Sequence, residues 1–301
     1  MYPTSKIIFN IQVNIRRTKE LIFYTQILLA IFFPILHYSQ TTYQDYQLVN
    51  ENGIFVEKFG SNNQDENRFT ANNTIFKEGT KFTYSYEHIT SDSIRHFFEY
   101  DDYGSWRFIS PDSISDNTIK EVKIIVKQGL NPMIKYIPDY NQTIIKFNYY
   151  SKKEKAPFGG RSGVIENKKN IWIHPPRDRY FGILELNPFP YVRLPLEVGA
   201  HWNWELQIGE IWSDYRWKIW SGNILNKYFY RITRKQLLET PLGEIECFVI
   251  ESTAESRIGK TKLTSYFNTK YGFVKLCYLN IDGSKTNLIL EKHTRKETST
   301  E

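Results

Sequence analysis

The sequence predicts an all-β protein in which an antiparallel meander forms an open barrel, a half-barrel or a sandwich, in one β unit or two. Aromatic residues make up 16% of the 301 residues, and flat side chains favour pleated sheets. Residues 200–208 alternate between apolar and polar side chains, which indicates a strand with one buried face. The last hundred residues contain strand-like runs at roughly ten-residue spacing. We find no convincing amphipathic helix after the first forty residues.

The first forty residues are typical of a secretory signal. A basic stretch, residues 6–19, precedes an apolar run at residues 21–36, and a short polar exit ends at Gln40. This order predicts a signal peptide over residues 1–40, cleaved near Gln40, with an uncleaved anchor as the alternative. The apolar run is short for a spanning helix, which needs about 20 residues. No cysteine follows the run, which argues against lipid attachment at a mature N-terminal cysteine.

The basic balance of the whole chain comes partly from this segment. The formal charge is +6, and loss of the segment, which holds four basic residues and one acidic residue, leaves about +3. We therefore expect no nucleic-acid partner. Export to the periplasm or the medium follows from the signal.

The rest of the chain is expected to contain an amino-terminal β-rich region, 41–190, a carboxy-terminal antiparallel β domain, 191–293, and a polar tail, 294–301. The amino-terminal region either continues the same sheet or forms a second β unit. Its turn is Asn52-Gly53. Its expected strands are 81–89, 94–101, 105–109, 121–128 and 143–150, and its expected loops are 60–73 and 152–163. Residues 187–196 contain three prolines, which exclude a helix or a central strand and predict a covering segment.

Residues 196–220 hold five of the seven tryptophans. Trp202 and Trp204 share one strand face with Leu206 and Ile208, so we expect them to anchor the sheet. On the same alternation, Trp212 and Trp220 fall on a face with Asp214, Arg216 and Lys218. These two tryptophans are therefore expected to contact something outside the core.

The carboxy-terminal region is predicted to be a meander. Its expected strands are 228–233, 245–252, 261–267, 271–280 and 285–291. Thr240-Pro241-Leu242-Gly243 predicts one turn, and Asp282-Gly283 predicts a tight hairpin. Cys247 and Cys277 then lie on strands separated by a third, roughly 10 Å apart. A disulfide needs Cα atoms within about 7 Å, so two free thiols are expected, and their spacing does not suit a metal.

Several motifs in this half resemble those of a group of uncharacterised bacterial exported proteins. The motifs are Pro195-Leu196-x2-Gly199-x2-Trp202, Thr240-Pro241-Leu242-Gly243-x3-Cys247-x2-Ile250 and Tyr266-Phe267-x3-Tyr271-Gly272-Phe273-Val274. Domains of this group look like open β-barrels, similar in outline to the carriers that ferry lipoproteins between bacterial membranes. The resemblance covers residues 194–290, and it implies a fold and a compartment but no catalytic residues.

Two kinds of ligand fit the arrangement of apolar and aromatic residues in the predicted strands. Residues 245–252 carry apolar side chains on both faces, so both faces need a cover, and an apolar or lipid-like ligand in a curved sheet is one candidate. The alternative is a core filled by the protein's own side chains. A glycan is the second candidate, stacked on Trp212 or Trp220 beside Asp214 and Arg216, with Asn203 and Gln207 as further partners. Its alternative is a rim of aromatic side chains packed on lysine and arginine stems.

An enzyme site is the least favoured hypothesis. Such a site would lie around His174, Arg177, Arg179, His201 and Asp214, where a histidine with a nearby carboxylate could do acid–base work. The sequence, however, contains no nucleophile-elbow, zinc-helix or phosphate-loop motif. Two prolines between His174 and Arg177 present these side chains rigidly. Arg177 or Arg179 could bind a carboxylate or phosphate, but pairing of Arg177 with a loop carboxylate such as Glu185 is the preferred interpretation.

We therefore expect an exported, non-catalytic envelope protein without a cofactor or metal. An apolar or lipid-like ligand is favoured over a glycan or a purely structural role, and a hydrolase comes last. The candidate ligand-binding residues are Trp212, Asp214, Arg216, Trp220, His174, Arg177 and Arg179.

Overall fold

The computed structural model describes residues 46–100, 106–129 and 140–295. The predicted signal peptide, its cleavage site and most of the polar tail lie outside these residues. The strands are β1 Tyr46–Glu51, β2 Ile54–Phe59, β3 Lys81–Ile89, β4 Arg95–Tyr100, β5 Trp106–Ile109, β6 Ile119–Val126, β7 Thr143–Ser151, β8 Arg161–Glu166, β9 Asn170–Ile173, β10 Tyr191–Arg193, β11 His201–Ile208, β12 Ile224–Thr240, β13 Gly243–Ser256, β14 Gly259–Asn268, β15 Gly272–Leu279 and β16 Lys285–Thr294. Short 3₁₀ helices are η1 Pro111–Ser113, η2 Arg179–Leu186 and η3 Glu210–Trp212.

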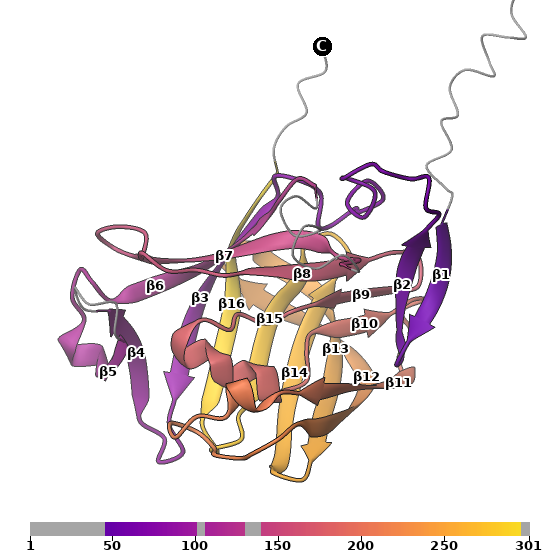
Figure 1. Ribbon diagram of the computed structural model, residues 1–301. Coiled ribbons are helices and arrows are strands. Elements are labelled where there is room, and N and C mark those ends of the chain that lie inside the picture. Colours follow the sequence, from indigo (N-terminus) through magenta and orange to yellow (C-terminus); the bar gives the residue numbers. More distant parts are fainter. Residues whose placement is uncertain (1–45, 101–105, 130–139, 296–301) are drawn as a thin grey trace, which may run out of the picture. The chain divides into compact units, whose positions relative to one another are not determined.

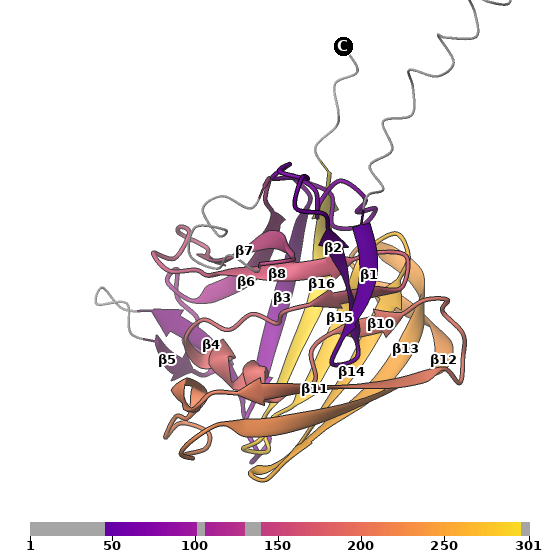
Figure 2. The ribbon, with the colours of Figure 1, turned by 45° about the vertical axis from the view of Figure 1, so that its right-hand side comes forward.

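Twelve strands form one antiparallel sheet that curves into a nearly closed barrel (Figures 1 and 2). Their order is β10-β9-β8-β7-β6-β3-β16-β15-β14-β13-β12-β11, and the β4–β5 hairpin branches from β3. The all-β prediction is confirmed. Strands from the amino-terminal half continue the same sheet, because β3 pairs with both β16 and β6.

The barrel has one seam, between the edge strands β10 and β11, where side chains meet but the strands do not pair. The rings of Tyr191 on β10 and Trp202 on β11 lie 5.6 Å apart. The tip of the separate β1–β2 hairpin bonds to both sides of the seam. The Tyr191 hydroxyl donates to Gly53 O at 2.8 Å, and the Glu205 amide donates to Asn52 O at 3.3 Å.

The concave side of the sheet is covered by η2 and the residues that follow it. Seven residues of η2 are buried, and side chains of the sheet bond to the backbone just beyond. The Thr261 hydroxyl donates to Leu186 O at 2.9 Å, and the Tyr230 hydroxyl donates to Phe189 O at 3.0 Å. The predicted cover is therefore correct, with the short edge strand β10 inside it.

The predicted meander is confirmed and its strands extend further than expected, most of all β12. Trp202, Trp204 and Ile208 are buried while His201 and Glu205 are exposed, as the alternation predicts. Cys247 on β13 and Cys277 on β15 are both free thiols, with β14 between their strands.

One part of the sequence prediction needs correction. The segment 152–163 is not a loop throughout, because β8 begins at Arg161 and pairs with β7 and β9. The predicted turn at Asn52-Gly53 is confirmed, and the strands on either side of it form the β1–β2 hairpin. The strands in both places are short and rely on tertiary contacts that local patterning does not reveal.

Candidate functional site

A hollow of about 390 Å³ lies where the β4–β5 hairpin meets η2 and the segment between β11 and β12. We call it the aromatic pocket. It is lined by Phe98, Trp106, Arg107, Phe108, Tyr180 and Arg216. Its size falls within the range of about 300–1,000 Å³ that small-ligand sites occupy.

The wall of the aromatic pocket follows from strand geometry. Trp106 and Phe108 are two residues apart on β5 and so point to the same side, and Phe98 is the cross-strand partner of Phe108. The Phe98 ring centroid lies 5.2 Å from that of Trp106 and 5.5 Å from that of Phe108. Tyr180 of η2 closes the wall with an edge-to-face contact to Phe108 at 4.5 Å. The rings therefore hold one another in fixed orientations.

Both arginines of the aromatic pocket are held by carboxylates. Arg216 Nη2 donates to Asp214 Oδ2 at 2.7 Å, and its Nε donates to Asp214 Oδ1 at 2.9 Å. These bonds to Arg216 lower the pKa of the Asp214 carboxyl. Arg107 Nε donates to Glu99 Oε2 at 2.8 Å, and a hydrogen bond from Ser115, followed by those from Arg107, lowers the pKa of the Glu99 carboxyl. The charges thus cancel in pairs while guanidinium donors remain at the mouth of the pocket.

Tyr180, in the wall of the aromatic pocket, carries a hydroxyl that stays protonated. Burial, followed by the nearby carboxylate of Asp282, raises the pKa of Tyr180 above its usual value. Its hydroxyl donates to Asp282 Oδ2 at 3.4 Å. Tyr180 is therefore fixed as a neutral side chain.

The interpretation of Trp212 and Trp220 as outward-facing strand residues is wrong. Residues 209–223 are not a strand: they contain η3 and a turn closed by an Asp214–Lys218 bridge, so the period of two does not apply. Trp220 is buried and Trp212 is half-buried. The exposed apolar side chains of this segment are Ile211, Tyr215 and Ile219.

The second group of predicted site residues surrounds a buried carboxylate. Arg177 Nη1 lies 3.6 Å from Glu185 Oε1, which confirms the preferred pairing, and His174 Nδ1 lies 3.8 Å from the same oxygen. His174 is also enclosed by the rings of Trp172 and Phe189. Arg179 instead lies over the ring of Phe158. These contacts orient the chain that enters η2.

The structure brings the two predicted groups close to each other beside η2. The Arg177 guanidinium carbon lies 5.9 Å from the Trp212 ring, and that of Arg216 lies 5.9 Å from the Tyr180 ring. A Cβ atom on Gly182 would lie 3.3 Å from Trp217, so the glycine permits this close packing. Of the predicted residues, only Arg216 lines the aromatic pocket itself.

The remaining residues of the aromatic pocket were missed from sequence. Trp106 and Phe108 alternate within a strand that was predicted, so two aromatic rings on one strand face were a usable signal. Phe98 and Tyr180 carried no such signal, because only the fold brings them to the same place.

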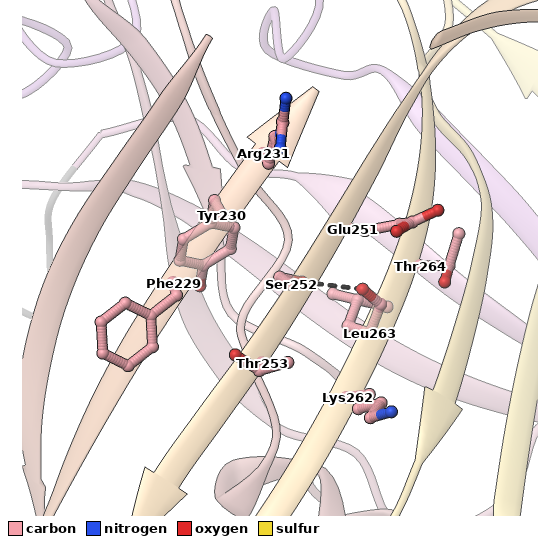
Figure 3. A pocket seen from close by; sticks show the side chains of 9 residues that line it. All are labelled: Phe229, Tyr230, Arg231, Glu251, Ser252, Thr253, Lys262, Leu263 and Thr264. Atoms are coloured by element: carbon pink, nitrogen blue, oxygen red, sulfur yellow. Dashed lines mark hydrogen bonds between the residues drawn. The ribbon is translucent and has the colours of Figure 1, made fainter. Parts of the chain in front are cut away.

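Another hollow lies on the outer face of the sheet (Figure 3). Phe229 and Arg231 of β12 line it together with residues of β13 and β14, and the Ser252 hydroxyl beneath donates to Leu263 O at 2.8 Å. Its exposed side chains alternate with buried ones along each strand. This pattern is typical of a solvated sheet face.

A third hollow, of about 210 Å³, lies at the seam beside Trp172, His174 and Trp204. The β1–β2 hairpin forms part of its lining. Within the described part of the chain, no group of three or more His, Cys, Asp or Glu residues is placed to hold a metal ion. No helix among the described residues is long and apolar enough to cross a membrane.

No family model matches the sequence, and no curated protein matches it. Three solved structures are similar to this chain. A putative exported protein with a YmcC-like fold from Bacteroides fragilis shares 10% identity at a TM-score of 0.39, with 73% of this chain and 97% of that chain covered. A putative lipoprotein from Parabacteroides distasonis shares 10% identity at a TM-score of 0.42, with 73% and 99% covered. The hypothetical lipoprotein YmcC from Escherichia coli shares 7% identity at a TM-score of 0.33, with 78% and 92% covered.

Proposed function

We propose that this chain is an exported, non-catalytic protein of the bacterial envelope that binds a glycan in the aromatic pocket. Export is supported by the charge, apolar run and polar exit of the first forty residues. The observation that carries glycan binding is the combination of rigid aromatic faces with guanidinium donors whose charge is already compensated.

A sugar ring matches both parts of this combination. Its C–H face is apolar enough to cover an aromatic ring, and its hydroxyl edges accept hydrogen bonds from guanidinium groups. Because Glu99 and Asp214 compensate Arg107 and Arg216, the pocket favours a neutral ligand over an anion.

An apolar or lipid-like ligand is the second candidate. Phe108 is 39% exposed at the pocket, so a chain or ring that covers it would remove apolar surface from water. The interior of the sheet is less suitable for such a ligand because η2 and the residues beyond it are buried against the concave face. The same aromatic pocket is thus the place to look for either ligand.

A non-catalytic role is supported by the contacts of the titratable candidates. Asp214 is engaged by Arg216, Glu185 is buried beside Arg177, and His201 is exposed on β11. Acid–base catalysis needs a base within hydrogen-bond reach of the substrate and a partner that orients it. Asp214 and Glu185 are thus held in ion pairs with arginines.

The test is a binding screen with the full-length protein against neutral oligosaccharides, followed by titration of the strongest one. We expect saturable binding that Phe108→Ala weakens about tenfold or more, as truncation of a central aromatic contact does. Phe229→Ala is the matched control, because Phe229 is 42% exposed on the outer face, and we expect it to leave affinity unchanged.

A fluorescent fatty acid is titrated in parallel. Saturable fatty-acid binding that depends on Phe108, without oligosaccharide binding, would replace the glycan by the apolar ligand. Binding of neither probe, or equal losses in the Phe108 and Phe229 variants, would remove the aromatic pocket as the site.

A further inference from the structure

Basic side chains gather on the outer face of the sheet where β6, β7 and β8 lie side by side (Figure 1). Lys146 on β7 is the direct cross-strand partner of Arg161 on β8. The neighbours of Lys146 along the strand, Ile145 and Phe147, are buried in the core, so Lys146 points outward. Residues directly opposite each other share a face, so Arg161 points the same way.

Two further lysines extend this group along β7. Lys127 follows the end of β6, and its amide donates to Ile144 O at 2.8 Å. Lys155 forms a bridge with Tyr150 near the other end of β7. Lys127, Lys155 and Arg161 are exposed and Lys146 is half-buried. We call Lys127, Lys146, Lys155 and Arg161 the basic patch.

The charges of the basic patch repel one another. The charge of Lys155, then burial, then the charges of the other two residues of the patch lower the pKa of Lys146, so every charged group that shifts it is a cation. Like charges directly opposite each other on neighbouring strands destabilise a sheet. The sheet therefore carries an unfavourable contact between Lys146 and Arg161 on its outer face.

No carboxylate of the described residues forms an ion pair with the basic patch. Glu121, on the same face of β6, is paired with Lys123 at 2.9 Å. Asp178, whose carboxylate lies beside Gly160, is already faced by two arginines outside the patch. Exposed Glu154 adjoins Lys155 in the sequence, and four positive charges less this one negative charge leave +3.

We propose that the basic patch binds an anionic polysaccharide, a sugar chain that carries carboxylate, phosphate or sulfate groups along its length. Such a ligand would relieve the repulsion that the sheet itself leaves uncompensated. The patch crosses three strands, or about 10 Å at the usual strand spacing, so an extended chain with several charges fits it better than one small anion. The choice of a polysaccharide rests on export, which is part of the proposed function, but not on a ligand in the aromatic pocket.

Two other polyanions fit the basic patch less well. Peripheral membrane binding combines basic charge with buried apolar area, and none of the large apolar side chains exposed among the described residues lies on β6, β7 or β8. Single-stranded nucleic acid stacks its bases on aromatic rings. The ring beside Lys155, that of Tyr150, is already covered by Lys123 Nζ at 3.9 Å.

The test is titration of the full-length protein with polygalacturonate, which carries a carboxylate on each sugar, and with neutral dextran. We expect saturable binding of polygalacturonate alone, with an affinity that falls as salt is added. Lys146→Gln with Arg161→Gln should raise the Kd for polygalacturonate by about tenfold or more. Because the two substitutions remove a repulsion, the urea midpoint should stay the same or rise.

The matched control removes two charges elsewhere on the outer face. Lys227→Gln with Arg231→Gln changes β12, where the cross-strand partners on β13 are Glu255 and Glu251, and should alter the Kd by less than about twofold. Lys127→Gln with Lys155→Gln is a second patch variant that changes only exposed side chains, and it should weaken binding about as much as the first. Both patch variants should keep any affinity for a neutral oligosaccharide in the aromatic pocket, so the two proposals can fail separately.

Several results would overturn the proposal. These are no saturable binding of polygalacturonate, binding that is insensitive to salt, or equal losses in the patch and control variants. Tighter binding to phosphatidylglycerol vesicles would assign the basic patch to a membrane surface instead. Tighter binding to single-stranded DNA would replace the polysaccharide by a nucleic acid.

Discussion

Substitution of Gly53 tests whether the β1–β2 hairpin closes the barrel seam. Gly53 has φ +109°, and a Cβ atom there would lie 2.5 Å from Asn203 O and 2.7 Å from Trp204 Cβ. Asn203 O is a backbone atom and Trp204 Cβ is bonded directly to the backbone. Neither atom can move aside alone, so the hairpin tip must move. The movement breaks the hydrogen bonds that Tyr191, Arg193 and Glu205 make to the tip.

The expected loss has two parts. The strained backbone costs about 1–2 kcal/mol for a residue with a side chain, and each lost hydrogen bond costs roughly 0.5–1.5 kcal/mol. We therefore expect Gly53→Ala to lower the free energy of unfolding by about 3–5 kcal/mol. Gly199→Ala is the matched control, because Gly199 has φ +96° and no atom within 4 Å of the added Cβ. It should cost only the backbone part, about 1–2 kcal/mol.

Urea denaturation followed by tryptophan fluorescence measures both variants. If Gly53→Ala and Gly199→Ala lower stability equally, the tip does not lie tightly against β11. The account of seam closure would then be refuted.

Three further predictions concern buried groups. Glu166 accepts hydrogen bonds from the backbone amides of residues 74–76, so Glu166→Gln should cost about 2–4 kcal/mol in urea denaturation, and a loss below 1 kcal/mol would contradict this role. Burial raises the pKa of Cys247 to about 11, so at pH 8 its native thiol should react about a hundredfold more slowly with a disulfide reagent than an ordinary one. Equal reaction rates in native and urea-unfolded protein would argue against burial. Burial lowers the pKa of His88 to about 4, so the unfolded chain binds this proton first and stability falls as the pH drops from about 6.5 to 4, by up to about 3 kcal/mol. Burial raises the pKa of Glu57 to about 7, which makes stability depend on pH with the opposite slope. The check is therefore the difference in the free energy of unfolding between wild type and His88→Asn, which should change with pH.

Most of the strands could be predicted because their signal is local. Apolar and polar residues alternate along 201–208 and 81–89, and a strand with one buried face requires that alternation. The Thr240–Gly243 and Asp282-Gly283 turns are local signals of the same kind. The free thiols followed from strand order alone, because β14 separates the two cysteines.

The site could be predicted only in part. The expected pairing of Arg177 with Glu185 is present, since Glu185 follows a short distance along the same chain and its carboxylate can reach the guanidinium. The outward direction assigned to Trp220 was wrong because residues 209–223 do not keep the strand period. Because this segment does not keep the strand period, Ile211 and Tyr215 are exposed although the alternation would have placed them on the buried face.

The sequence by itself determined the all-β class, the antiparallel meander and the covering role of the proline-rich segment, because these depend on local periodicity and on backbone chemistry. Only the tertiary structure decided that one sheet unites both halves and that the Asn52-Gly53 tip lies in the seam. The same holds for Phe98 and Tyr180, which meet in the aromatic pocket. These arrangements depend on contacts between residues far apart in the chain, and curvature of the sheet, rather than local pattern, brings them together.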